Sequence, residues 1–126
     1  MNEKAPMQIL QLKDYALLLK ALGEEARLKM IGLLQDGELC VCDIMKVLDL
    51  AQSTTSRHLA YLKNSGWVVA RRSGKWMHYR LHPNIFSDPI QNAVIQQITG
   101  LPEVQTLREK LEIYLEKKSK STTHCF

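Results

Sequence analysis

The chain has 126 residues, of which 45% are hydrophobic and 24% are charged, the composition of an ordinary globular domain. This length allows one domain with a modest core, and chains of this size often complete their burial by pairing with a second copy. The longest purely apolar stretch, residues 15–19, is too short to cross a bilayer, and residues 1–10 lack a secretion-signal pattern. With only three cysteines, we expect a reduced, cytoplasmic protein with no membrane partner rather than a disulfide scaffold.

The net charge of +4 is concentrated in one part of the sequence. Residues 1–49 carry six basic and eight acidic side chains, and residues 88–126 carry five of each. Residues 50–87 carry six basic side chains and no acidic one, together with three of the four histidines. A segment of this charge predicts a surface that attracts a polyanion. The alternative is a solvated face that lacks acids by chance.

The apolar periodicity predicts six helices and one β-hairpin. The helices are expected over residues 8–22, 24–35, 40–48, 53–64, 88–99 and 103–117, and the hairpin strands over 67–72 and 76–81. Helix, helix, short helix, turn, helix, hairpin is the order of a winged helix-turn-helix domain. We therefore predict a mainly α fold with a hairpin wing over residues 1–118, and a flexible tail over 119–126 that carries Cys125.

The last predicted helix carries an apolar stripe with the 3-4-3 spacing that a partner helix covers in a coiled coil. The stripe consists of Val104, Leu107, Leu111 and Tyr114. Together with the small core, it predicts a homodimer that pairs through the first and last helices.

The helix at 53–64 carries residue types that suit DNA recognition. If Leu59 and Leu62 face the core, the opposite side presents short hydroxyls and one arginine. Hydroxyls bond phosphates or base edges, and arginine can bond guanine through two hydrogen bonds. The hairpin cations suit the phosphate backbone or the minor groove, although charges at a hairpin also resist edge aggregation, and Ser53 also suits a helix cap. The predicted DNA contacts are Gln52, Ser53, Thr54, Ser56, Arg57, Arg71, Arg72 and Lys75.

Cys40 and Cys42 open the helix that precedes this one. Cysteines in the first turn of a helix offer thiolates, which select soft ions. On a regular helix residues i and i+2 point about 200° apart, so both sulfurs can bind one ion only if the helix start is distorted. Ion binding would then strain the helix that positions residues 53–64, which predicts a switch. The alternative is that both cysteines act as small hydrophobic side chains.

Three motifs resemble the ArsR/SmtB family of metal-responsive repressors, and within it the arsenic-resistance-operon repressors. They are Glu-Leu-Cys-Val-Cys-Asp-Ile at 38–44, Ser-Arg-His-Leu at 56–59 and Gly-Lys-Trp-Met-His-Tyr-Arg-Leu at 74–81. The resemblance covers residues 17–83. It implies a homodimer that binds double-stranded operator DNA, represses a resistance operon and dissociates when As(III) or Sb(III) binds.

The resemblance also implies roles for individual residues. Cys40 and Cys42 take the place of the family's thiolate ligands. The DNA-binding role extends over the whole stretch 52–58, which adds His58 to the predicted contacts, and it covers the hairpin cations.

The sequence departs from the family pattern at the third ligand. Many arsenic repressors have a cysteine three residues after the second, where this chain has Met45. Trivalent arsenic favours three thiolates, and Cys125 is the remaining thiol. Residues 117–125 can extend up to about 26–29 Å, which makes Cys125 a candidate ligand. If Cys125 does not bind, solvent or a small thiol is the third ligand.

The sequence also differs from the patterns of other sensing classes of this family. Cadmium/lead-type relatives add cysteines near the N-terminus, which residues 1–39 lack, and zinc/cobalt-type relatives use histidines on the last helix, which residues 103–117 lack. A thiol-redox repressor is a further alternative, but a Cys40–Cys42 disulfide would form a strained ring. The chain has no nucleophile elbow and no phosphate loop, so we do not expect an enzyme.

Overall fold

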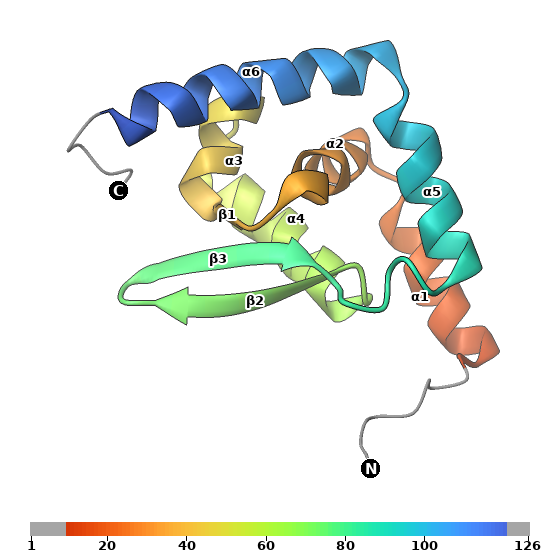
Figure 1. The fold of residues 1–126 in the computed structure, drawn as a ribbon. Helices are drawn as coiled ribbons and strands as arrows, with labels where there is room; N and C mark the ends of the chain where they lie inside the picture. Colours follow the sequence, from red (N-terminus) through yellow and green to blue (C-terminus); the bar gives the residue numbers. More distant parts are fainter. Residues whose placement is uncertain (1–9, 121–126) are drawn as a thin grey trace.

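A computed structural model describes residues 10–120 and has the predicted winged helix-turn-helix architecture (Figure 1). The helical elements are α1 (Leu12–Ala21), α2 (Glu25–Leu33), the 3-10 turn η1 (Leu34–Asp36), α3 (Val41–Leu48), α4 (Gln52–Asn64), α5 (Pro89–Thr99) and α6 (Pro102–Ser119). The strands are β1 (Leu39–Cys40), β2 (Val68–Ser73) and β3 (Trp76–Leu81), which form an antiparallel sheet in the order β1-β3-β2. The predicted fold class is confirmed.

The helix-turn-helix is formed by α3 and α4. Asp49 adopts a left-handed conformation, with φ of 55°, and ends α3. Ile44 and Val47 of α3 and Leu59 and Leu62 of α4 are all buried in one core cluster. This packing makes the position of α4 depend on the position of α3.

The hairpin of β2 and β3 forms the wing and is anchored at its base. Trp67 is fully buried, and its Nε1–H donates to the Leu18 carbonyl of α1 at 2.9 Å. The Gln91 side chain of α5 donates to the Gly66 carbonyl at 3.0 Å. At the other end, Gly74 and Lys75 form the turn, and the φ of 65° at Gly74 is one that glycine adopts without strain.

Several boundaries differ from the sequence prediction, and the structure shows the cause of two of them. The first described helix begins at Leu12, because Gln11 occupies its N-cap and donates its backbone N–H to Asp14 at 2.9 Å. Cys40 lies outside the third helix: it is the last residue of β1 and the N-cap of α3. The short strand β1 was not predicted, since two residues carry no period-2 pattern.

Of the apolar stripe of α6, Val104 and Leu111 are buried within the chain, while Leu107 and Tyr114 are partly exposed. Helix α6 crosses α2 and α3 (Figure 1), and Val104 and Leu111 are buried there. A helix that packs on the core of its own domain has the same 3-4 spacing as one that packs on a partner chain. The pattern alone therefore does not say which of the two covers the stripe. Exposed large apolar side chains lie elsewhere: Leu12, Leu17 and Leu19 of α1, Phe86, Ile90, Leu101 and Ile113.

The predicted domain boundary and tail lie at the end of α6. The helix continues to Ser119, one residue past the predicted boundary, and Cys125 lies outside the described residues. Between residues 10 and 120, none of the helices combines the length and the apolar character that a membrane crossing requires.

Gly32 of α2 lies close to Val104 of α6, and we predict that Gly32→Ala destabilises the fold. A methyl group at Gly32 would lie 2.7 Å from Val104 Cγ1, and the β-branched valine has few alternative rotamers. Overpacking costs about 1–3 kcal/mol, against a gain of up to about 1 kcal/mol in helix propensity. Urea unfolding should therefore give a lower free energy of unfolding for the variant.

Val104→Ala provides the matched control for this prediction. It opens the space that the new methyl group needs. The double variant should therefore lose less free energy of unfolding than the sum of the losses in the two single variants. A Gly32→Ala variant that unfolds at higher urea than the original chain would contradict the close packing.

Candidate functional site

The N-terminal half of α4 presents most of the predicted DNA contacts to solvent. Gln52, Ser53 and Arg57 are exposed, and Thr54 and Ser56 are partly exposed. Ala51, not Ser53, occupies the N-cap, so Ser53 lies in the first turn with its side chain exposed. Thr55 faces the core, and its hydroxyl donates to the Ala51 carbonyl at 2.9 Å. The first turn of α4 contains no acidic residue.

His58 lies on the other side of α4, apart from these residues. It is 8% exposed, and its Nδ1 is 3.2 Å from Nη1 of Arg27 in α2. The Arg27 guanidinium also lies over the Tyr61 ring, at 4.2 Å from the ring centre. The structure therefore places His58 among the contacts between α4 and α2, apart from the exposed residues of the predicted DNA contacts. The sequence already indicates this position, because His58 precedes the core-facing Leu62 by four residues and so lies on the same face of the helix.

Burial lowers the pKa of His58, and the positive charges of Arg27 and Arg57 lower it further. We predict that the free energy of unfolding falls as the pH is lowered through about 6.5, the ordinary pKa of histidine, because the unfolded chain then binds more protons than the folded one. His58→Gln should make this dependence shallower, as measured by urea unfolding across the pH range.

His82→Gln is the comparison for this measurement, because burial also lowers the pKa of His82 and Arg80 adds to the effect. Each single variant should remove part of the pH dependence. An unchanged slope in His58→Gln would show that His58 keeps its ordinary pKa in the folded chain.

The wing cations divide into two groups. Arg72 and Lys75 are exposed near the tip, and Lys75 Nζ lies 5.7 Å from the centre of the Trp76 ring. Arg71 instead donates two hydrogen bonds to Glu38, from Nε at 2.8 Å and from Nη2 at 2.6 Å. These bonds hold the pKa of the Glu38 carboxyl below its usual value. Of the three predicted wing contacts, only Arg71 has a carboxylate partner among the described residues.

The structure brings the two cysteine sulfurs together. Cys40 and Cys42 are both buried, and their Sγ atoms are 3.2 Å apart. Cys40 has extended backbone angles (φ −72°, ψ 150°), whereas Cys42 lies in the first turn of α3. The change from strand to helix between them removes the 200° divergence expected on a regular helix. We call these two residues the cysteine pair.

The spacing of the cysteine pair suits one soft ion. Sulfurs that each lie about 2.3 Å from one ion, at bond angles near 90–110°, are about 3.3–3.8 Å apart. The observed separation is within a few tenths of an ångström of that range. Among residues 10–120, no three His, Cys, Asp or Glu side chains are arranged to hold a metal ion.

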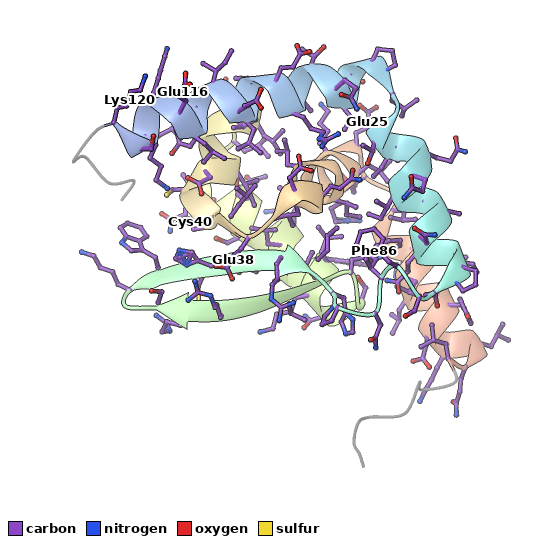
Figure 2. All side chains as sticks on the ribbon, in the orientation of Figure 1. Glu25, Glu38, Cys40, Phe86, Glu116 and Lys120 are labelled. Atoms are coloured by element: carbon purple, nitrogen blue, oxygen red, sulfur yellow. The ribbon has the colours of Figure 1, made fainter. Side chains whose placement is uncertain are left out.

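The last turns of α6 pack beside the cysteine pair. Asp43 is buried; it accepts from the backbone N–H of Cys40 at 2.9 Å and from Lys118 Nζ at 2.6 Å. Burial, together with the charge of Asp43, raises the pKa of Tyr114 to about 12. Figure 2 shows Cys40 between the end of α6 and the sheet. Lys118 and Tyr114 were not predicted as parts of this site, since only the tertiary fold brings α6 to it.

Comparisons with known proteins agree on one family. The family described as "Bacterial regulatory protein, arsR family" matches residues 24–69. The arsenical resistance operon repressor of Escherichia coli K12 is 52% identical over 69 residues, which cover 54% of this chain and 59% of the repressor. A cadmium resistance transcriptional regulatory protein CadC homolog of Staphylococcus aureus is 35% identical over 85 residues, 67% of this chain and 70% of that protein. The chain thus spans less than two thirds of the Escherichia coli repressor.

A solved structure supports the fold. It is the solution structure of the homodimeric winged helix-turn-helix DNA-binding domain Mb0332 from Mycobacterium bovis, described as a possible ArsR-family transcriptional regulator. The TM-score is 0.57 at 27% identity, and the match covers 90% of this chain and 89% of that one.

Proposed function

The chain belongs to the ArsR family of bacterial regulatory proteins, and we propose that it is a homodimeric repressor that leaves operator DNA when As(III) or Sb(III) binds the cysteine pair. The observation that carries this proposal is the 3.2 Å approach of two buried sulfurs at the start of α3. Because α3 packs on α4, an ion that changes the start of α3 changes the helix that would contact DNA. The matched relatives are regulators, so the enzyme alternative is set aside.

The DNA contacts that we propose follow the exposure of the side chains. Helix α4 supplies Gln52, Ser53, Thr54, Ser56 and Arg57, and the wing supplies Arg72 and Lys75. We assign His58 and Arg71 to support of these elements instead, because Arg27 and Glu38 already bond them.

We propose that the homodimer forms through α1, where three leucines are exposed. Leu12 is 88% exposed, and Leu17 and Leu19 are about half exposed. Exposed leucine side chains lose contact with water on pairing, which is favourable. The matched Mycobacterium bovis domain is homodimeric, which supports a homodimer here.

Cys125 is our candidate for the third sulfur ligand. Asp43, Lys118 and Tyr114 bring the end of α6 to the cysteine pair, so the chain leaves α6 close to the site. A third thiolate would complete the pyramid that trivalent arsenic favours.

The second candidate effector is Cd(II) or Pb(II). The match to the cadmium-resistance regulator favours it, and thiolates bind these ions as well. Parallel titrations of the reduced protein with arsenite, antimonite, cadmium and lead, read as loss of operator binding, would separate the two.

We predict different effects for an arginine of α4 and one of the wing. Operator affinity should fall steeply with salt for every variant, because phosphate contacts release counterions. Arg57→Ala should cost about 1–3 kcal/mol and relax the base preference, as expected for a base contact. Arg72→Ala should weaken binding to all sequences alike and reduce the salt dependence. Binding to a set of single-base operator variants would measure both; identical sequence profiles would contradict the division of roles.

We predict that Cys40→Ser and Cys42→Ser keep operator affinity and abolish release by arsenite, since each removes a thiolate. Electrophoretic mobility or fluorescence anisotropy with added arsenite measures this. The matched control is Met45→Ala, which changes a nearby thioether and should leave release intact. A Cys40→Ser, Cys42→Ser double variant that still leaves the operator on arsenite addition would rule out the site.

Cys125→Ser, tested in the same titration, should weaken arsenite binding several-fold without changing operator affinity. An arsenic–sulfur coordination number of two in X-ray absorption would instead make solvent or a small thiol the third ligand.

A further inference from the structure

We propose that the Glu38–Arg71 ion pair couples the cysteine pair to the wing, and that Arg71 is a positioning residue for DNA release rather than a phosphate contact. This inference rests on the proposed function, because it states how occupation of the cysteine pair reaches the wing.

The sheet register places the cysteine pair in line with the wing. Cys40 of β1 pairs with His78 of β3, and His78 pairs with Arg71 of β2. Paired residues share one face of a sheet, so these three positions form a single row across it. Cys40 and Arg71, 31 positions apart in the sequence, are thereby joined through strand β3. A displacement of Cys40 therefore acts directly on the backbone of the wing.

The ion pair reinforces this connection between the two outer strands. Glu38 immediately precedes β1 and lies two residues before Cys40, and Arg71 lies on β2. Both carboxylate oxygens of Glu38 bond the guanidinium, at 2.8 and 2.6 Å, in the paired geometry that arginine and carboxylate favour. Because β3 lies between β1 and β2, this contact bridges β3 (Figure 2 shows Glu38 over β3). The wing thus follows any movement of the segment that ends in Cys40.

A comparison with Arg72 shows why Arg71 is less suited than its neighbour to bind a phosphate. Arg72 points to the opposite face of β2, since successive strand residues alternate, and it is exposed. Arg71 has two of its nitrogens committed to Glu38, and His78 and Arg80 add positive charge around the same carboxylate. Glu38 is thus an anion held among the cations of the wing. Its position fits a role in orienting the wing, not in binding DNA, which it would repel.

Binding of one ion to both sulfurs has to fix the junction between β1 and α3, because Cys40 is extended and Cys42 is helical. We infer that the junction shifts β1 and carries Glu38, Arg71 and the wing with it. Loss of the ion pair should therefore leave arsenite binding to the free protein intact while weakening its effect on DNA. Coupling between two sites is reciprocal, so arsenite affinity of the DNA-bound protein should change by the same factor.

The test compares Glu38→Gln and Arg71→Lys with the matched control Glu103→Gln, which removes the acidic partner of an ion pair with Lys29 that lies outside the wing. Arg71→Lys keeps the positive charge that a phosphate contact needs and loses the two-bond geometry. For each full-length variant we would measure operator affinity without and with saturating arsenite, and arsenite affinity without DNA. We divide the operator affinity without arsenite by the operator affinity with arsenite. This ratio should be about twofold to fivefold smaller in Glu38→Gln and in Arg71→Lys than in the original chain. It should be unchanged in Glu103→Gln, and arsenite affinity of all free proteins should stay the same.

The double variant Glu38→Gln, Arg71→Lys distinguishes the ion pair from two independent effects. Its ratio should be no smaller than that of either single variant. An unchanged ratio in Glu38→Gln, or additive effects in the double variant, would overturn the coupling while the proposed function stands. Failure of the original chain to leave the operator on arsenite addition would overturn the proposed function itself, and the coupling with it.

Discussion

Cys40 belongs to two elements at once, and the arrangement of the candidate site depends on that. As the last residue of β1 it pairs with His78 of the wing, and as the N-cap of α3 it donates its backbone N–H to Asp43. Its extended backbone turns its sulfur toward Cys42, which the helix alone would direct away. The same residue is thus attached to the wing through β3, to α4 through α3, and to α6 through Asp43 and Lys118. An ion bound at this position, as we propose, would act on three elements without any long chain of contacts.

The surface of α4 and the wing that we propose to face DNA depends on contacts made behind it. Arg27 bonds His58 and lies over Tyr61, and Trp67 bonds Leu18, so α4 and the base of the wing are both held from the core side. These contacts leave the N-terminal turns of α4 and the tip of the wing exposed. Neither carries an acidic side chain, which is the physical basis of the positive segment read from the sequence.

Local patterns predicted most of the fold. The strand 76–81 and the helix 53–64 match the structure to within one residue, because periodicity and flanking glycines are local signals. The strand β1 was missed because it exists only through its pairing with β3. The stripe at Val104 and Leu111 was assigned to a partner chain because an apolar pattern does not say what covers it. Arg71 was assigned to DNA because the sign of a charge does not say which group it meets, and Glu38 lies 33 residues away.

The exposure of the Glu38–Arg71 pair limits how much of the response it can carry. The Arg71 side chain is 58% exposed, so water and salt screen its attraction for Glu38, and pairs of this kind contribute little on their own. The route through α3 to α4 runs instead through buried side chains, which pack too closely to deform without moving their neighbours. The larger share of any ion-driven change in DNA affinity should therefore pass through Ile44, Val47, Leu59 and Leu62. The Glu38–Arg71 ion pair determines the smaller contribution that passes through the wing. Because salt screens this pair, that contribution should depend more strongly on salt than the contribution through α4.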